Sequence, residues 1–133
     1  MKLLTENRHE YVTELIQLQP HSIMTFSQFD IKELATTSIN ILSNAQGFEK
    51  QILKPRNWTF RTNNKLHSKL AIGENGFIIG SWNFSNNSTQ DFHEVALCIS
   101  KAEAPEIYAQ LCDYFEALWN RSTKKVKWED EYT

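Results

Sequence analysis

The sequence predicts an α/β fold in which helices flank a mixed β-sheet. Two observations lead to this prediction: short aliphatic and β-branched runs recur along the chain, and segments with helical spacing of apolar residues accompany them. The chain has 133 residues and a hydrophobic share of 41%, which suffices for one domain with a single core. No apolar run approaches the roughly 20 residues that span a membrane.

The first third of the chain is predicted to form a helix, a strand and a second helix. Residues 6–18 carry apolar residues at helical spacing, and residues 22–26 read as a strand after the proline that ends this helix. Residues 30–44 are predicted to be helical because Asp30 and Glu33 fit a capping box and a glycine follows the segment.

Strands and one long helix are predicted for the rest of the chain. Pro105 suits the first turn of a final helix that extends to Trp119, and a polar loop is expected at residues 85–91. The predicted strands cover residues 51–53, 58–61, 66–73, 77–83 and 94–99.

A single domain is predicted for residues 1–122, followed by a charged tail at residues 123–133. The start of the chain turns polar too soon for a secretory signal. Cys98 and Cys112 fall in a predicted strand and helix, so we expect buried thiols rather than a disulfide. Reduced thiols are typical of a cytoplasmic protein, and we expect that location.

His67 and Lys69 are the first candidates for chemistry. Side chains two residues apart share one face of a strand, and the nearby segment Gly80-Ser81-Trp82-Asn83 adds a hydroxyl and an amide. A nucleophile or base, a fixed cation and two neutral donors suit attack on a phosphodiester without a metal. We therefore predict that His67, Lys69, Ser81 and Asn83 are catalytic.

The turn between the two strands decides whether these side chains meet. A two-residue Asn-Gly turn would put Ser81 and Asn83 on the wrong face. A three-residue loop at residues 74–76 pairs His67 with Asn83 and Lys69 with Ser81. We predict the three-residue loop, because it places all four polar groups on one face.

Glu94 is the fifth predicted catalytic residue. It alternates with Phe92 and Ala96 on one face of an otherwise apolar strand, where an unpaired carboxylate is costly. We expect its partner to be the second ring nitrogen of His67, which Glu94 would orient.

Taken in order, these residues resemble the signature of the phospholipase D superfamily, which is His-x-Lys, four residues, Asp and then Gly-Ser-x-Asn. His67, Lys69 and residues 80–83 carry the match, and the resemblance runs from about residue 22 to residue 119. The chain departs from the signature in two ways: Glu74 replaces the usual aspartate, and the gap before the glycine is one residue short. Because Glu74 falls at a turn, we expect a turn or capping role for it.

The resemblance implies a two-step reaction without cofactor or metal. Neutral His67 attacks phosphorus and forms a phosphohistidine, a second and protonated histidine protonates the leaving oxygen, and water then hydrolyses the intermediate. Lys69 and Asn83 stabilise the charge on the equatorial oxygens. The chain contains one motif and the reaction needs two, so we expect a homodimer in which both copies of His67 meet at a two-fold axis.

A basic stretch with two interleaved aromatic residues leads into the predicted site. No acid lies between Glu49 and Glu74. This composition fits a groove that tracks phosphates, and it fits equally a solvated loop with two core aromatics. The cations are Lys50, Lys54, Arg56, Arg61, Lys65 and Lys69. The predicted substrate-binding residues are Arg61, Lys65, Trp82 and Ser85.

The sequence thus favours a metal-independent nuclease for DNA or RNA, with DNA preferred, since single-motif members of the family resemble small nucleases. The basic stretch and the lack of membrane features favour nucleic acid over a membrane partner. Two alternatives stay open. One is a phospholipid-processing phosphodiesterase, and the other is a catalytically silent dimer that binds nucleic acid or a protein.

Overall fold

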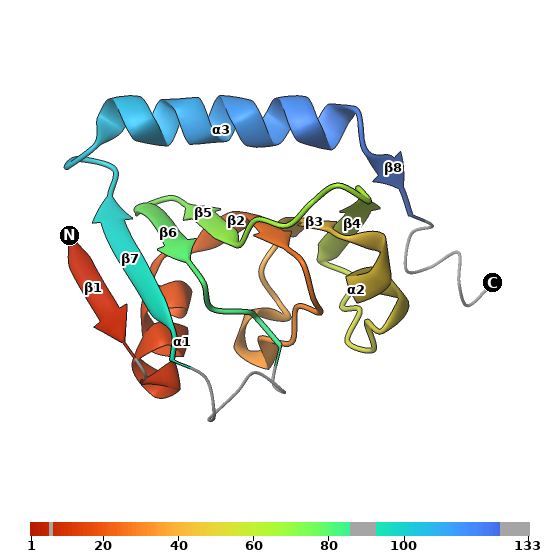
Figure 1. Cartoon of the computed structure of the whole chain (residues 1–133), viewed down its shortest axis with the longest axis horizontal. Coiled ribbons are helices and arrows are strands. Elements are labelled where there is room, and N and C mark those ends of the chain that lie inside the picture. The colour runs from red at the N-terminus through yellow and green to blue at the C-terminus, as the bar shows by residue number, and fades with distance from the viewer. Residues whose placement is uncertain (6, 86–92, 126–133) are drawn as a thin grey trace.

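A computed structural model describes residues 1–5, 7–85 and 93–125 of the chain (Figure 1). Its centre is one mixed sheet of eight strands in the order β1-β7-β6-β5-β2-β3-β4-β8. The strands are β1 (Lys2–Thr5), β2 (Pro20–Thr25), β3 (Ile39–Ser43), β4 (Trp58–Thr62), β5 (Leu70–Gly73), β6 (Gly76–Gly80), β7 (Val95–Ser100) and β8 (Thr123–Lys124). The α-helices are α1 (Arg8–Gln17), α2 (Ala45–Glu49) and α3 (Pro105–Asn120), and a 3₁₀ turn, η1, covers Lys32–Leu34. The predicted α/β class with a mixed sheet is confirmed.

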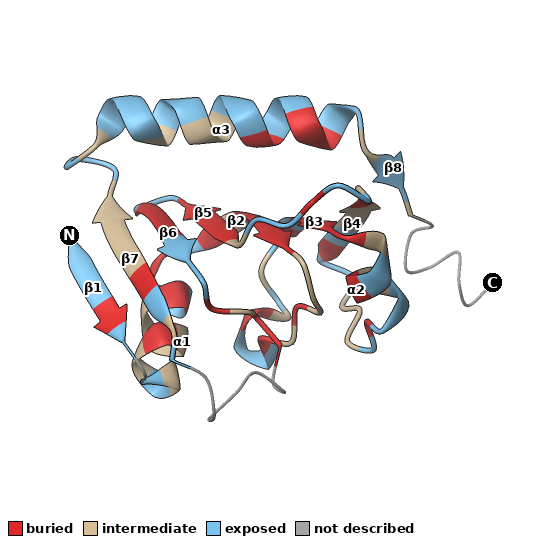
Figure 2. Cartoon of the chain, viewed as in Figure 1, coloured by how far each residue is buried: buried red, intermediate tan, exposed pale blue. Residues whose placement is uncertain are grey.

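Each face of the sheet has its own apolar core. On one face α3 lies along the sheet and buries Phe115, Leu118 and Trp119 against strand residues such as Leu70 and Ile72. Figure 2 shows that the buried residues of α3 lie on the side that faces the strands. On the other face α1 supplies Tyr11 and Leu15 to the larger core cluster. Within the described residues, no helix is long and apolar enough to cross a membrane.

Several predicted elements are confirmed. The first helix is α1, whose N-cap Asn7 accepts a hydrogen bond from Glu10 N at 3.0 Å. The strand expected at residues 22–26 is β2, and the final helix begins at Pro105 as predicted. Cys98 and Cys112 are free thiols, although both are half-buried rather than buried.

The helix predicted at residues 30–44 is wrong. Only the single turn η1 forms, and Ile39–Ser43 is the strand β3, which pairs in parallel with both β2 and β4. Pairing on both edges of β3 outweighs the local helical spacing. The strand expected at residues 51–53 is also absent, and Gln51 instead anchors Phe29 through its side-chain amide at 2.8 Å.

Two strands were not predicted. The strand β1 pairs antiparallel with β7 at one edge of the sheet, and β8 pairs with the end of β4 at the other. Thr123–Lys124 therefore belongs to the sheet, although the tail was predicted to begin at residue 123. The rest of that tail, residues 126–133, and most of the predicted polar loop, residues 86–92, lie outside the described residues.

The predicted register between β5 and β6 is wrong by one residue. Gly73 pairs with Gly76, so the turn consists of Glu74 and Asn75 alone. Gly76 has a φ of 153°, and a Cβ atom there would lie 2.1 Å from Ile99 O on the neighbouring strand. The glycine is thus required inside the ladder, against β7, instead of in the loop.

Candidate active site

One end of the sheet collects the polar side chains that the sequence singled out. The antiparallel and parallel pairings run so that β2, β3, β4 and β6 finish at this end, whereas β5 and β7 begin there. Lys69 immediately precedes β5, Ser81 immediately follows β6, and Glu94 immediately precedes β7. His67 and Asn83 lie two residues beyond Lys69 and Ser81. The predicted catalytic residues therefore lie together at one end of the sheet. They lie in the segments that flank the strands, and not on one face of two paired strands as predicted.

His67 lies on a crossover segment, residues 63–69, which leads from the end of β4 to the start of β5. Because β3 and β2 lie between those strands, the segment passes the ends of both. Asn44, which follows β3, holds it there: its Nδ2 donates to Asn64 O at 3.2 Å and to Leu66 O at 3.1 Å. The same side chain caps α2 by accepting from Gln46 N at 2.9 Å.

Phe26 is the second residue that positions His67. It follows β2, and its ring centroid lies 5.0 Å from that of His67 with an interplanar angle of 53°. The imidazole itself is exposed, and Lys69 is half-buried. Close packing of α2 fixes the Phe26 backbone, because a Cβ atom on Gly47 would lie 2.3 Å from Phe26 O. Neither Phe26 nor Asn44 was predicted as a site residue, because their only signal in the sequence is that each directly follows a buried strand.

The Gly-Ser-x-Asn segment is tied to the start of β7. Ser81 Oγ accepts from Val95 N at 3.1 Å, and Ser81 N donates to Val95 O at 2.9 Å. Gly80 allows this approach, because a Cβ atom there would lie 2.2 Å from Val95 O. Asn83 is half-buried, and within the described residues its Oδ1 atom is buried without a hydrogen-bond partner. Such an unpaired polar group is rare in a folded chain and is typical of sites that receive another group.

Glu94 lies on the other side of the Gly-Ser-x-Asn segment. It is half-buried and close to Tyr11: burial raises the pKa of the Tyr11 phenol, and the Glu94 carboxylate raises it further, whereas Arg8 lowers it. The predicted hydrogen bond from the His67 ring to the Glu94 carboxylate is not among those formed by the described residues. In the single chain, His67 is held by Phe26 and by the crossover segment.

The predicted substrate-binding residues have different surroundings. Lys65 is exposed on the crossover segment. Arg61 donates from Nη1 to Trp119 O at 2.7 Å and lies over the Trp119 ring at 4.6 Å, so it fastens the end of α3. Trp82 is only 3% exposed and stacks on Tyr11 at 4.8 Å. Ser85 is buried as well, and the burial of these two residues argues against the predicted substrate contacts.

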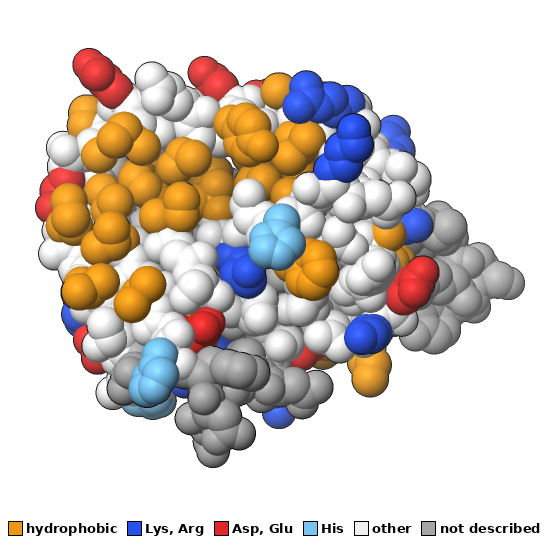
Figure 3. All heavy atoms as spheres, viewed as in Figure 1, with side chains coloured by type: hydrophobic (Ala, Val, Ile, Leu, Met, Phe, Trp, Pro, Cys, Tyr) orange, Lys and Arg blue, Asp and Glu red, His pale blue; other side chains and the backbone are white. Residues whose placement is uncertain are grey.

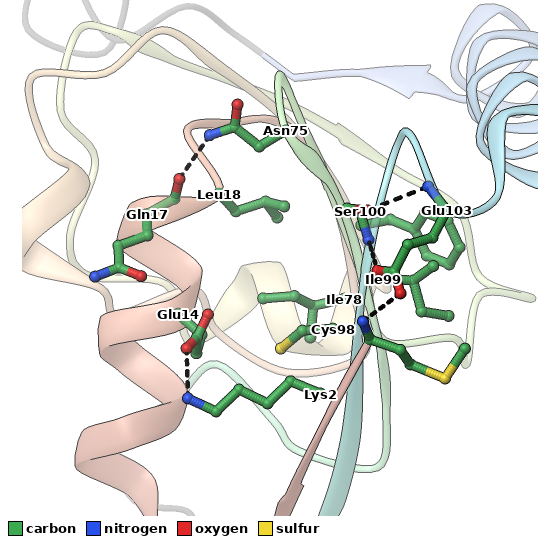
Figure 4. A pocket seen from close by; sticks show the side chains of 12 residues that line it. Lys2, Glu14, Gln17, Leu18, Asn75, Ile78, Cys98, Ile99, Ser100 and Glu103 are labelled. Carbon is green, nitrogen blue, oxygen red and sulfur yellow. Dashed lines mark hydrogen bonds and ion pairs between the residues drawn. The ribbon is translucent and has the colours of Figure 1, made fainter.

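A separate cavity of about 310 Å³ lies between α1 and β7 (Figure 4). Lys2 and Glu14 pair there at 2.8 Å, and Cys98 lies beside Ile78. Burial, together with Glu14, raises the pKa of the Cys98 thiol to about 11. None of the predicted catalytic residues lines this cavity, which is separate from the candidate site at the end of the sheet. Among the described residues, no group of three or more His, Cys, Asp or Glu side chains could hold a metal ion.

The family model for the cardiolipin synthase, phospholipase-D-like domain matches residues 3–119. The chain belongs to this phospholipase-D-like family. Two solved structures share the fold at 17% identity and cover 93% of this chain. They are Nuc, a phospholipase D family member from Salmonella typhimurium (TM-score 0.66, 97% of that chain), and NucT from Helicobacter pylori (TM-score 0.67, 98% of that chain).

A third structure is a larger protein. TrmBL2, an archaeal chromatin protein with a novel mode of DNA binding, matches with a TM-score of 0.59 and 11% identity, over 94% of this chain and 54% of that one. No curated protein matches the sequence at a significant level.

The first of the two departures from the phospholipase-D-like signature, the glutamate in place of aspartate, lies far from the site. Glu74 occupies the two-residue turn between β5 and β6, at the opposite end of β5 from Lys69, and its side chain is exposed. Its backbone N–H donates to Gln19 O at 3.2 Å, which ties the turn to the corner between α1 and β2. The turn therefore keeps the Glu74 carboxylate away from the candidate site.

Proposed function

We propose that this phospholipase-D-like chain is a metal-independent phosphodiesterase that cleaves nucleic acid, with DNA as the preferred substrate. The convergence of His67, Lys69 and Asn83 at one end of the sheet carries the proposal. It supplies an exposed imidazole for attack, the ammonium of half-buried Lys69 and the amide of half-buried Asn83, whose Nδ2 group can donate to a phosphate oxygen. These groups suit a reaction in which charge develops on phosphate oxygens.

The proposed reaction has two displacements at phosphorus. In the first, a neutral ring nitrogen of His67 forms a P–N bond, the bond to the leaving oxygen breaks, and His67 of the partner subunit gives that oxygen a proton. In the second, the same partner histidine takes a proton from water, whose oxygen forms a new P–O bond as the P–N bond breaks. Lys69 and Asn83 hold the non-bridging oxygens throughout. The two histidines begin in opposite protonation states, which two imidazoles near neutral pH can share.

An uncovered apolar face supports the dimer that this mechanism needs. Leu3 pairs with Leu97, and Leu97 pairs with Ile79, so these three side chains form a row across β1, β7 and β6. Leu3 is 62% exposed and Ile79 43%, and Val95, on the same face of β7 as Leu97, is 52% exposed. Figure 3 shows a broad hydrophobic patch over this side of the molecule.

This face adjoins the site, because Val95 directly follows Glu94 and Ile79 directly precedes the Gly-Ser-x-Asn segment. Burying one such aliphatic side chain is worth about 1.5–3 kcal/mol. We propose that a second copy of the chain covers the face by two-fold symmetry, which would bring the two copies of His67 toward each other.

Charge supports nucleic acid as the substrate. Residues 50–73 contain no acid and lead along β4 and the crossover segment to His67. Exposed cations beside a phosphodiester-cleaving site attract a polyanion and hold it against the surface. Lys65 and Lys69 each lie two residues from His67.

The test is cleavage of labelled single- and double-stranded DNA and RNA in excess EDTA by the parent and by His67→Ala. His21, half-buried at the start of β2 and so at the other end of that strand, supplies the matched control His21→Ala. The parent and His21→Ala should cleave at least one nucleic acid, and His67→Ala should not. Failure to cleave any nucleic acid, together with hydrolysis of a phospholipid in the same buffer, would contradict the substrate. Cleavage by His67→Ala would contradict the mechanism.

A further inference from the structure

A polar cavity of about 410 Å³ lies at the same end of the sheet, where β4 finishes and β8 begins. Its wall includes Thr62, Asn63, Asn64, Arg121, Ser122 and Lys125. Among the described residues no carboxylate lines it, and each of these six side chains can donate a hydrogen bond. Its chemistry therefore favours an anion.

The charges around the cavity are unbalanced. The chain has no acid between Glu116 and Glu129, and none between Glu49 and Glu74. Arg121 is exposed, and its guanidinium forms no ion pair or side-chain hydrogen bond within the described residues. Figure 3 shows Lys and Arg side chains gathered near the C-terminal end of α3.

The end of α3 could have opposed an anion, because the last carbonyls of a helix carry negative partial charge. Here the carbonyls of Leu118 and Trp119 already accept hydrogen bonds. Trp119 O accepts from Arg61 Nη1 at 2.7 Å and from Ser122 N at 3.2 Å, and Leu118 O accepts from Ser122 Oγ at 2.6 Å. The Arg121 guanidinium therefore does not bind these carbonyls, and it is available to bind an anion.

Hydrogen bonds fix the position of Asn63 in the wall of the cavity. Asn63 Nδ2 donates to Ser122 Oγ at 3.3 Å, and Asn63 Oδ1 accepts from Lys65 N at 2.9 Å. These bonds join the crossover segment to the turn after α3, so the cations on one wall are fixed relative to the segment that carries His67. Asn64 lies three residues before His67, which limits the separation of their Cα atoms to about 10 Å. A separation of that order spans no more than a few nucleotides of one strand, whose phosphates rise ~3.4 Å each along the helix axis of a duplex.

We propose that this cavity, the β4–α3 cavity, binds a backbone phosphate of the nucleic acid a few nucleotides from the scissile one, with Arg121 and Lys125 as its cationic ligands. The inference rests on the proposed function. The cavity holds the strand and does not take part in bond cleavage. A polynucleotide gains from both the cavity and the catalytic residues, whereas an isolated phosphodiester reaches only the catalytic residues.

The test compares an oligonucleotide with bis(p-nitrophenyl) phosphate, which has a single phosphodiester. The variant Arg121→Met with Lys125→Met keeps most of each aliphatic stem and removes two charges. The matched control, Lys32→Met with Lys101→Met, removes the same charge from η1 and from the loop before α3. In the cavity variant, KM for the oligonucleotide should rise about tenfold, and the slope of log KM against log salt should fall by about 0.7, because one phosphate contact of a single strand is lost. Hydrolysis of the small diester should be unchanged in both variants.

Binding in EDTA separates this inference from the proposed function. Oligonucleotide binding is measured on His67→Ala with and without the cavity substitutions. If the parent cleaves no nucleic acid but the cavity substitutions still weaken binding and flatten its salt slope, the cavity inference stands without the nuclease.

Three outcomes would overturn the inference. The cavity substitutions could leave oligonucleotide affinity and salt slope unchanged. They could abolish only the binding of inorganic phosphate, which would make the cavity a site for the free anion. They could abolish binding to phosphatidylglycerol vesicles without affecting the oligonucleotide, which would assign the cavity to a lipid surface.

Discussion

Replacing Asn44 by alanine tests how the site is held together. Asn44 is buried and makes three side-chain hydrogen bonds: one caps α2, and two hold Asn64 O and Leu66 O. Loss of the cap costs about 1 kcal/mol, and loss of each hydrogen bond to a carbonyl about 1 kcal/mol more, so the variant should lose about 3 kcal/mol. With a urea m-value of ~2 kcal/mol per M, the unfolding midpoint should fall by about 1.5 M.

The same substitution should impair catalysis, because the crossover segment carries His67. A displacement of the nucleophile by about 1 Å can cost 100-fold in rate, so kcat should fall by up to that factor. The control Asn44→Asp keeps an oxygen for the α2 cap but removes both donors to the segment. It should retain more of the stability than Asn44→Ala and lose a similar share of kcat. A midpoint within about 0.3 M of the parent, with kcat unchanged in Asn44→Ala, would refute this account of the site.

Three further predictions concern residues around the site and in the cavity between α1 and β7. Gly80→Ala should lower stability by about 1–3 kcal/mol in urea unfolding, because its Cβ atom would meet Val95 O at 2.2 Å; an unchanged midpoint would refute the close approach. Trp82→Ala should cost about 3–5 kcal/mol of stability, as for a core aromatic. A raised KM with parental stability would instead assign Trp82 to the substrate. Cys98, with a pKa of about 11, should react slowly with iodoacetamide at pH 8, where about one thiol in 1,000 is ionised, and faster with each step toward pH 10. The alkylation rate is measured by mass spectrometry. A rate at pH 8 equal to that of a cysteine peptide would contradict the raised pKa of Cys98.

The sequence predicted which residues gather at one end of the sheet better than the backbone that carries them. The order of His67, Lys69, Ser81 and Asn83 pointed to one cluster, and these residues do share one end of the sheet. The predicted strand face was nevertheless wrong, because β5 begins only at Leu70 and β6 ends at Gly80. Turn chemistry alone could not fix the register, since the packing of Gly76 against β7 is a contact between strands distant in sequence.

The misassigned helix has a similar cause. Residues 30–44 satisfy a capping box and helical spacing, yet Ile39–Ser43 gains partners on both sides as a parallel strand. That gain depends on β2 and β4 and cannot be read from the segment itself. Asn44 and Phe26 were missed for the same reason: an asparagine and a phenylalanine become site residues only because the crossover segment passes over the ends of their strands.

Mixing active and inactive chains tests the central proposal most directly, that two copies of His67 form one site. Parent and His67→Ala chains are combined in urea, refolded together, confirmed as dimers by gel filtration, and assayed on the preferred nucleic acid in EDTA. Because a mixed dimer would hold only one His67, activity should follow the square of the parent fraction, falling to about one quarter when half the chains are parent. Activity in direct proportion to the parent fraction, about one half in the same mixture, would show that each chain acts alone and would contradict the shared site.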